Sequence, residues 1–104
     1  MTEITCLIIE QILAVPKGRV CSYGGIARKA GLPNGARQVV RVLHSMSEKY
    51  KLPWHRIIRG DGTIGLTGEG KDLQMALLKA EGVEFKNQRY VDMQKFGVNR
   101  PDTL

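Results

Sequence analysis

The sequence predicts a small, mainly α-helical domain that contains a helix-turn-helix and a short β element. Apolar residues recur at helical spacing in four segments, and a dense turn sequence separates the second segment from a basic third one. The clearest strand candidate is the pair Ile57 and Ile58. The 104 residues leave room for one hydrophobic core and one site, so we expect residues 1–104 to form a single domain.

The first helix is expected to begin after Thr2, whose hydroxyl can cap it, and to end before Pro16 and Gly18. Because its apolar residues share one face, we interpret it as a structural helix that packs on the core. These apolar residues are Ile4, Ile8, Ile12 and Val15.

A second helix is predicted from its cap Ser22 through Ala30, with Gly31 as the residue that stops it. The turn sequence GLPNG fills positions 31–35 and leads into a third helix over about residues 34–47. One stripe of this third helix is expected to be buried and another is basic, which completes the helix-turn-helix pattern. The buried stripe comprises Ala36, Val39, Val40 and Leu43, and the basic stripe comprises Arg37, Arg41 and His44.

Polar residues 47–51 indicate a loop, which is followed by the short strand and a turn of sequence RGDG. Five glycines between positions 60 and 70 indicate either a loop whose backbone lies close to a ligand or a flexible connector. The glycine loop lacks a Gly-Lys-Ser/Thr ending and the strand-GxGxxG-helix context, which excludes a nucleotide-cofactor site.

A fourth helix is expected from about Lys71 until Gly82 closes it. Residues 83–85 and 89–91 are predicted to pair as a small hairpin, and residues 96–104 to form a frayed tail. The apolar stripe of the fourth helix comprises Leu73, Ala76, Leu77 and Ala80.

Sixteen Lys and Arg residues against ten Asp and Glu residues give a net charge of +6, which favours a polyanionic partner without requiring one. The apolar run CLII at 6–9 is too short for a signal peptide or a membrane span. We therefore expect no membrane partner and a cytoplasmic location, associated with the nucleoid if the source is bacterial. Cys6 and Cys21 match no zinc spacing and are expected to be reduced core residues, so neither a metal ion nor an organic cofactor is predicted.

Four motifs, VCSYGGIARKAG, NGARQVVRVL, LPWHRIIRGDGTIG and LLKAEG, follow one another along the chain. In their order and spacing, residues 3–85 resemble the DNA-binding domain of O6-alkylguanine-DNA alkyltransferases. The resemblance implies a winged-helix-like helix-turn-helix domain, as in the C-terminal domain of those enzymes. The enzymes have a Pro-Cys-His-Arg motif whose cysteine accepts the alkyl group, whereas this chain has Trp54 in the cysteine's place. It is similar in this respect to the alkyltransferase-like proteins, which bind alkylated guanine without repairing it.

Trp54 excludes alkyl transfer at the motif position on chemical grounds. A cysteine thiolate is a strong nucleophile, whereas an indole offers one N–H donor and no lone pair for displacement. The resemblance implies that His55 and Glu81 match the enzymes' proton relay, which here has nothing to activate. From the residues alone, Trp54 is also consistent with a core residue, His55 with a structural histidine and Glu81 with a solvated helix end.

The resemblance assigns the handling of DNA to Tyr23 and Arg37. In the family, the matching tyrosine rotates a phosphate as the damaged nucleotide turns out, and the matching arginine fills the vacated space. A phenol with a polar tip and a guanidinium that stacks suit these tasks. Without the resemblance, a half-buried tyrosine and a solvated arginine are the simpler interpretations. The expected DNA-binding set is Ser22, Tyr23, Arg37, Gln38 and Arg41.

The resemblance also implies that the third helix enters the minor groove, where base edges are nearly degenerate and lesions can be bound in any sequence. Two features depart from the family. The enzymes commonly have small residues at the positions of Val40 and Arg41. They often have an Asn-Pro hinge where this chain has HSMSEK at 44–49.

We expect the chain to act as a monomer that binds DNA containing O6-alkylguanine and flips the damaged base into a pocket without transferring the alkyl group. The resemblance implies that the lesion is then marked for nucleotide excision repair. The alternatives are an active transferase that uses Cys6, Cys21 or His55, and a helix-turn-helix transcriptional regulator. By resemblance, the pocket comprises Leu43, Pro53, Trp54, His55, Arg56, Ile64, Gly65, Thr67 and Gly68.

Overall fold

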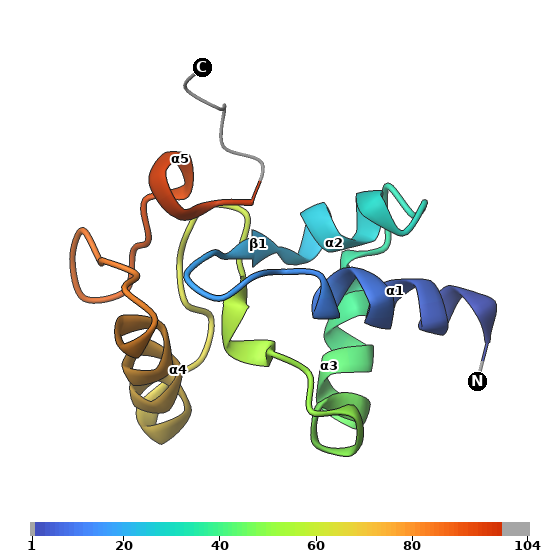
Figure 1. Cartoon of the computed structure of the whole chain (residues 1–104), viewed down its shortest axis with the longest axis horizontal. Helices are drawn as coiled ribbons and strands as arrows, with labels where there is room; N and C mark the ends of the chain where they lie inside the picture. Colours follow the sequence, from blue (N-terminus) through green and yellow to red (C-terminus); the bar gives the residue numbers. More distant parts are fainter. Residues whose placement is uncertain (1, 99–104) are drawn as a thin grey trace.

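A computed structural model describes residues 2–98, in which two short strands lie between a group of three helices and a second helical group (Figure 1). Helices α2 and α3 form the helix-turn-helix. The expected mainly α-helical domain with a short β element is therefore confirmed. The elements are α1 (Glu3–Leu13), β1 (Cys21–Ser22), α2 (Tyr23–Lys29), α3 (Ala36–Tyr50), the 3-10 helix η1 (Trp54–Arg56), β2 (Ile57–Ile58), α4 (Gly68–Ala80) and α5 (Met93–Phe96).

The first two helices begin at the predicted capping residues. Thr2 Oγ1 accepts a hydrogen bond from the Thr5 N–H at 3.1 Å, and Ser22 Oγ accepts one from the Gly25 N–H at 2.9 Å. The chain can turn after α2 because Gly31 adopts a φ of 85°, in the left-handed region. The sequence signals for these boundaries are confirmed.

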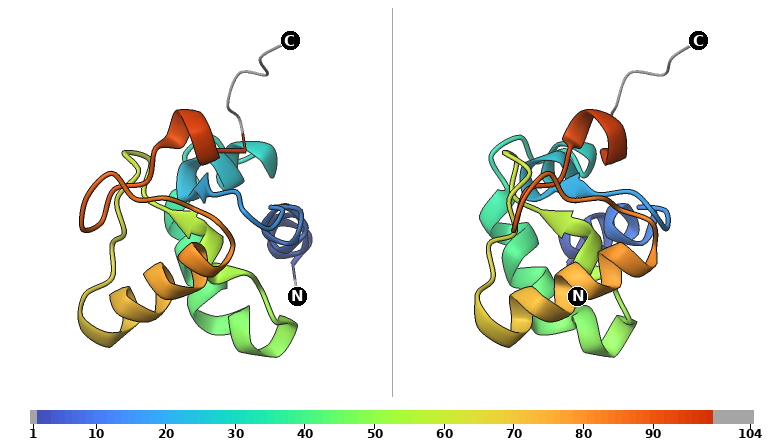
Figure 2. Two further views of the ribbon diagram at one scale, coloured as in Figure 1. Left: turned by 60° about the vertical axis from the view of Figure 1, so that its left-hand side comes forward. Right: turned by 90° about the vertical axis from the view of Figure 1, so that its left-hand side faces the viewer.

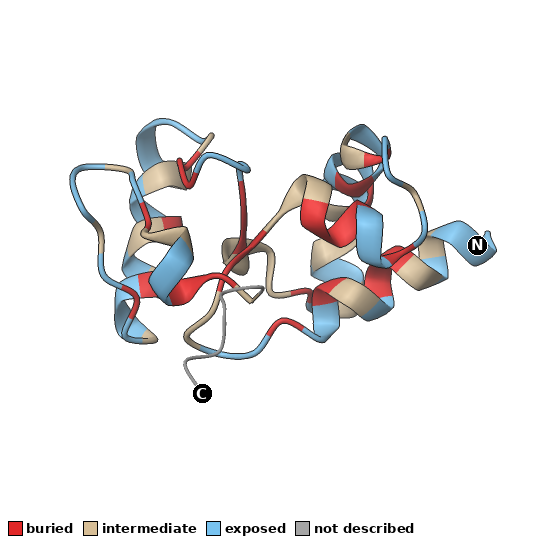
Figure 3. Ribbon diagram, turned by 90° about the horizontal axis from the view of Figure 1, so that it is seen from above, coloured by how far each residue is buried: buried red, intermediate tan, exposed pale blue. Residues whose placement is uncertain are grey.

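Buried side chains form two clusters rather than the single core that the length suggested (Figure 3). The strands β1 and β2 run parallel, with Cys21 paired to Ile57 and Ser22 paired to Ile58. Successive strand residues point to opposite faces, so Cys21 and Ile57 join the cluster around α1, α2 and α3, whereas Ile58 joins the cluster around α4 and α5. We call these the first and the second cluster. The strand pair thus joins the helix-turn-helix to the part that contains α4 (Figure 2).

Helix α3 is longer than predicted, because residues 47–50 continue the helix instead of forming a loop. It ends at Lys51, whose φ of 52° is left-handed. The predicted buried stripe is partly wrong: Val39 and Val42 are buried, whereas Val40 is 46% exposed. The exposed face of α3 therefore carries an apolar side chain that the pattern placed in the core.

Helix α4 begins three residues earlier than predicted, and its buried face is not the predicted stripe. The buried residues are Gln74 and Leu78. A buried glutamine is accommodated because its amide N–H groups donate to the carbonyl oxygens of His55 at 3.2 Å and Ile57 at 3.4 Å. The residues of the predicted stripe that lie exposed are Leu73, Ala76 and Ala80.

Residues 83–91 pair less extensively than the predicted hairpin. Phe85 and Val91 form a single antiparallel bridge, and the Lys86 N–H donates to the Tyr90 carbonyl oxygen at 2.8 Å. The segment therefore approaches a hairpin without forming strands in the described part of the chain.

The prediction of a frayed tail over residues 96–104 is wrong for residues 96–98. Phe96 is 8% exposed within the second cluster, and the Val98 N–H donates to the Val20 carbonyl oxygen at 2.9 Å. Residues 99–104 lie outside the described part of the chain. Between residues 2 and 98, no helix is long and apolar enough to span a membrane.

Candidate nucleic-acid interface

Trp54 begins η1, in a segment whose backbone is fixed by its neighbours. Leu52 is 4% exposed, and the Trp54 N–H donates to its carbonyl oxygen at 2.8 Å. The Arg56 N–H donates to the Pro53 carbonyl oxygen at 3.0 Å and closes the turn. The indole remains partly exposed and meets the His55 ring edge-on, with centroids 6.2 Å apart. Trp54 therefore belongs to neither cluster, and its interpretation as a core residue is wrong.

An open hollow lies against the indole, beside the C-terminal part of α3. A partly exposed indole at the wall of such a hollow can stack on a planar group or pack against an apolar one. The lining side chains are His44, Ser47, Glu48, Lys51, Leu52 and Trp54.

Glu81, the residue that caps the C-terminus of α4, gathers donors from three residues. His55 Nε2 lies 2.8 Å from Glu81 Oε2. Arg56 donates to the same carboxylate from Nε at 3.0 Å and from Nη2 at 2.8 Å, and the Gly18 N–H donates to Oε1 at 3.1 Å. The expected contact between His55 and Glu81 is present. The Glu81 side chain is only 10% exposed, so its interpretation as a solvated helix end is wrong.

The Glu81 carboxylate is stabilised in its charged form. Burial alone raises the pKa of this carboxyl group, but the hydrogen bonds from Arg56, His55 and a backbone N–H outweigh that effect and lower the pKa from 4.5 to about 2. A negative charge at the C-terminus of a helix also opposes the helix dipole. The donors therefore offset both the burial of the charge and its position.

Arg56 links this network to the loop between α1 and β1, because its Nη1 donates to the Val15 carbonyl oxygen at 3.0 Å. The resemblance predicts Arg56 in the base pocket, but it does not predict the bonds of Arg56 and the Gly18 N–H to Glu81. One signal was available, since a glutamate at a helix C-terminus calls for a counter-charge.

Ser22 and Tyr23 lie where β1 passes into α2. The Ser22 hydroxyl is engaged in capping α2. Tyr23 is half-buried against the first cluster. Burial raises the pKa of the Tyr23 phenol, and the charge of Arg59 opposes that rise only in part. The phenol is therefore protonated at neutral pH and can donate a hydrogen bond.

Arg37, Gln38 and Arg41 are exposed along α3, together with Val40. Residues 36–44 contain two arginines and no acidic residue, so this part of α3 presents a positive face. Such a face suits contact with phosphates. Gln38 and Arg41 also line a groove between α1 and α3. The residues that line this groove are Thr2, Ile4, Thr5, Ile8, Gln38, Arg41 and Val42.

The remaining residues of the predicted base pocket differ in exposure. Leu43 is half-buried against the first cluster, and Ile64 is fully buried in the second. Gly65 is half-buried, whereas Thr67 and Gly68 are exposed where α4 begins. The structure thus makes Ile64 a core residue and leaves the glycine segment accessible. Contact of this segment with a base stays a prediction.

The two cysteines have different environments, so the expectation that both are buried is wrong for one of them. Cys6 is exposed on α1, whereas Cys21 is buried at 2% exposure. Burial raises the pKa of the Cys21 thiol, and the charges of Lys29 and Arg28 offset this only in part. The Cys21 thiol is therefore a poor nucleophile at neutral pH.

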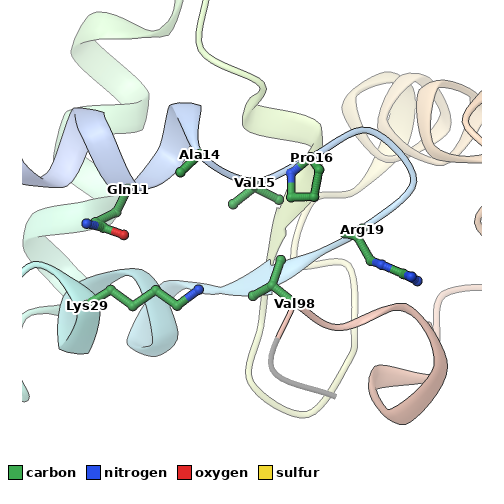
Figure 4. A pocket seen from close by; sticks show the side chains of 7 residues that line it. All are labelled: Gln11, Ala14, Val15, Pro16, Arg19, Lys29 and Val98. Carbon is green, nitrogen blue, oxygen red and sulfur yellow. The ribbon is translucent and has the colours of Figure 1, made fainter. Parts of the chain in front are cut away.

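A further hollow lies between α1, α2 and the segment that precedes β1 (Figure 4). Lys29 and Arg19 lie at opposite ends of it, and Arg19 Nη1 donates to the Lys95 carbonyl oxygen at 3.1 Å. None of the predicted site residues lines this hollow. The residues that line it are Gln11, Ala14, Val15, Pro16, Arg19, Lys29 and Val98.

The described residues contain no group of three His, Cys, Asp or Glu side chains that could hold a metal ion.

A helix-turn-helix with a positive second helix, joined to a Pro-Trp-His-Arg turn whose histidine meets a glutamate, defines a DNA-binding domain of the alkyltransferase class. The family model described as the DNA-binding domain of 6-O-methylguanine DNA methyltransferase matches residues 3–83, and the chain belongs to this family. The resemblance seen over residues 3–85 is thereby confirmed.

Among known relatives, the chain is 42% identical over 88 residues to a DNA base-flipping protein of Escherichia coli, and the match covers 85% of this chain and 68% of that protein. It is 36% identical over 106 residues to Alkyltransferase-like protein 1 of Schizosaccharomyces pombe, and the match covers 100% of this chain and 95% of that protein. A crystal structure of S. pombe Atl1 in complex with damaged DNA containing O6-carboxymethylguanine matches with a TM-score of 0.81 at 30% identity, and covers 93% of this chain and 95% of that chain.

Proposed function

We propose that this protein binds duplex DNA containing O6-alkylguanine, extrudes the damaged base and holds it without taking up the alkyl group. One observation carries the proposal: a partly exposed indole stands at the motif position beside His55, whose Nε2 lies 2.8 Å from Glu81 Oε2. The relatives named DNA base-flipping protein and the similar complex with O6-carboxymethylguanine support it.

The energetics of base extrusion are compatible with recognition that needs no covalent step. Flipping a base costs a few kcal/mol, and less for O6-alkylguanine, which pairs poorly because it has lost the N1 proton. Stacking on an aromatic side chain returns about 1–3 kcal/mol per base. Each buried methylene of the alkyl group adds up to about 0.8 kcal/mol. Contact with Trp54 can therefore offset the cost of extrusion, although the indole offers no nucleophile.

In this proposal α3 enters the minor groove, and residues of the helix-turn-helix contact different parts of the DNA. Tyr23 donates from its phenol to a phosphate as the nucleotide turns out. Arg37 stacks in the vacated space and bonds the orphaned base. The positive exposed face of α3 supports this arrangement, because it adds attraction to phosphates that is independent of sequence.

A competition titration with matched duplexes, with and without O6-methylguanine, tests the binding step. We expect the lesion duplex to compete at a much lower concentration than the undamaged one, whatever the flanking sequence. Equal competition by both duplexes, with a preference for one sequence, would instead identify a transcriptional regulator.

The intact mass of the protein after incubation with the lesion duplex tests the absence of transfer. We expect the mass to remain unchanged at stoichiometric DNA. A stoichiometric methyl adduct, mapped to Cys6, Cys21 or His55, would establish an active transferase and contradict the proposal.

We further propose that the protein acts as a monomer on chromosomal DNA, in the cytoplasm or nucleoid, and passes the lesion to nucleotide excision repair. A lesion that is bound and not repaired needs another system to remove it. With purified excision enzymes and an O6-alkylguanine duplex, incision should be faster when the protein is added. An unchanged rate of incision would refute the handover of the lesion to that pathway.

Sedimentation of the DNA complex tests the proposed monomer and should give one protein per lesion.

A further inference from the structure

Tyr23 and Arg59 lie next to each other at one end of the strand pair. Ser22 is paired to Ile58 in parallel register, and Tyr23 and Arg59 are the residues that follow the two strands. Parallel strands that start together also end at the same edge, so the register places these two residues side by side. The effect of the Arg59 charge on the Tyr23 phenol agrees with this placement.

The Arg59 guanidinium also lies over Gly65, in the glycine segment that leads to α4. A Cβ atom on Gly65 would lie 3.0 Å from Arg59 Nε and 3.6 Å from Nη2. A side chain at position 65 would therefore push the arginine away. The guanidinium is thus close both to the tyrosine expected to handle a phosphate and to the segment expected to hold a base.

The Arg59 side chain is exposed and has no hydrogen bond or ion pair within residues 2–98, so none of these residues uses its donors. The nearby carboxylate of Asp61 instead accepts hydrogen bonds from the Thr63 N–H at 3.0 Å and from Thr63 Oγ1 at 2.6 Å. These bonds, with a smaller contribution from Arg59, lower the pKa of Asp61.

The backbone of Arg59 is fixed, although its side chain has no hydrogen-bond partner in the described part of the chain. Its N–H donates to the Thr63 carbonyl oxygen at 3.1 Å, and its carbonyl oxygen accepts from the Gly62 N–H at 3.0 Å. A guanidinium on a fixed turn offers five donors in a planar fork, which matches the oxygen atoms of a phosphate.

We propose that Arg59 binds a backbone phosphate next to the extruded nucleotide, beside the phosphate contacted by Tyr23. The inference rests on the proposed function, because a nucleotide must leave the stack for its phosphate to reach the glycine segment. Arg59 would then stabilise the extruded state rather than the initial encounter. No residue of the predicted DNA-binding set lies on this turn.

The test compares wild type, Arg59→Gln and Lys17→Gln in titrations of a duplex that contains O6-methylguanine. Lys17 is the matched control, because it is exposed and lies in the loop that precedes β1, at the opposite end of the strand pair. Arg59→Gln should weaken binding roughly tenfold, the size of a hydrogen bond between charged groups. It should also reduce the slope of log affinity against log salt by about 0.9. Lys17→Gln should leave both quantities near wild type.

Single methylphosphonate substitutions around the lesion then locate the contact. At one position the neutral group should weaken wild type by the same factor as Arg59→Gln and should not weaken the variant further. If every substitution weakens the variant as much as wild type, Arg59 contacts no phosphate, and this inference is wrong while the proposed function stands. If wild type shows no preference for the lesion duplex, both the proposed function and this inference are wrong. Thermal unfolding of Arg59→Gln should match wild type, since the side chain makes no hydrogen bond or ion pair with residues 2–98.

Discussion

In the proposed function Trp54 determines the chemistry of the site, because an indole with no nucleophile stands at the motif position beside the His55–Glu81 contact. The histidine and glutamate that would activate a thiol are 2.8 Å apart, so their contact does not depend on having a thiol to serve. In this chain the contact holds the turn that carries the indole. In the proposed function the network therefore supports recognition, because no thiol stands at the motif position.

Replacement of Trp54 should weaken binding to the lesion duplex selectively. Trp54→Ala removes the stacking surface, and we expect a loss of about 1–3 kcal/mol on DNA containing O6-methylguanine. Binding to undamaged DNA should change little, because it depends on contacts with phosphates. Trp54→Phe keeps an aromatic face and should restore most of the affinity. Anisotropy of labelled duplexes measures the affinities of wild type and both variants for the two duplexes. An equal loss on both duplexes would assign Trp54 to folding or general DNA contact.

Arg37→Ala should also act on the lesion complex, through the stack rather than through the backbone. We expect weaker lesion binding with little change in the salt slope, because in the proposed function the arginine contacts a base and not a phosphate. Titrations at several salt concentrations measure this slope. A uniform loss on damaged and undamaged DNA, with a reduced slope, would show that Arg37 contacts the backbone instead.

The two thiols should differ in reactivity towards a disulfide reagent. Cys6 is exposed on α1, whereas Cys21 is buried with its pKa raised. We expect one thiol to react rapidly in the folded protein and the second only after denaturation. The variant Cys6→Ser should lose the fast reaction. A fast reaction that persists in this variant would show that Cys21 is reached by opening of the first cluster.

The contacts of a residue could be predicted from the sequence where a motif includes that residue. They could be predicted less well where the contacts depend on how the chain is buried. The pairing of His55 with Glu81 could be expected from the resemblance, but the bond from Arg56 to the same carboxylate could not. Arg59 gave no signal in the sequence, because its position depends on the register of two strands that are distant along the chain. Long-range pairing of this kind leaves no local pattern.

At the scale of helices, the sequence predicted which segments are helical better than which faces are buried. In α4, apolar spacing favoured a stripe through Leu73, yet Leu73 is 53% exposed and Gln74 is buried. The buried face carries a glutamine because the carbonyl oxygens of His55 and Ile57 need a donor there. A hydrophobic pattern cannot detect this requirement. Capping residues, by contrast, are local signals, and they located the start of α1 and α2.

The end of α3 contains a strained residue that a glycine should relieve. Lys51 is the only non-glycine residue with positive φ in the described chain, at 52°. This conformation costs an L-residue roughly 1–2 kcal/mol, part of which glycine loses again through the entropy of the unfolded chain. We expect Lys51→Gly to raise the free energy of unfolding by up to about 1 kcal/mol, and Tm by several degrees.

Lys49→Gly is the control for this change, because it lies in the last turn of α3 within the helix. That variant should lower the free energy of unfolding by about 1 kcal/mol. Thermal unfolding followed by circular dichroism distinguishes the two variants. If both glycines lower Tm equally, the left-handed conformation at the helix end stores no strain.

For the molecule as a whole, two features join the halves that carry the two clusters. The strand pair contributes one face to each cluster. The Glu81 network adds a polar connection, since the carboxylate at the end of α4 binds Arg56 and the Gly18 N–H, and Arg56 reaches the Val15 carbonyl oxygen. The helix-turn-helix and the segment with the indole are therefore held in one arrangement by groups that include an ionised carboxylate.

This connection predicts that stability falls at acid pH as Glu81 takes up a proton. The pKa of Glu81 is lowered from 4.5 to about 2 on folding, so its contribution is fully present above pH 4.5 and is lost as the pH falls towards 2. Glu81→Gln removes the charge and should lower the free energy of unfolding at pH 7 by roughly 2 kcal/mol. The difference in free energy of unfolding between wild type and the variant should then shrink between pH 4.5 and pH 2.

Urea unfolding at a series of pH values measures this difference. Glu84→Gln is the control, since the ion pair between Glu84 and Lys95 lies at the exposed surface. A difference that stays constant down to pH 2 would mean that the carboxylate does not hold the two halves together.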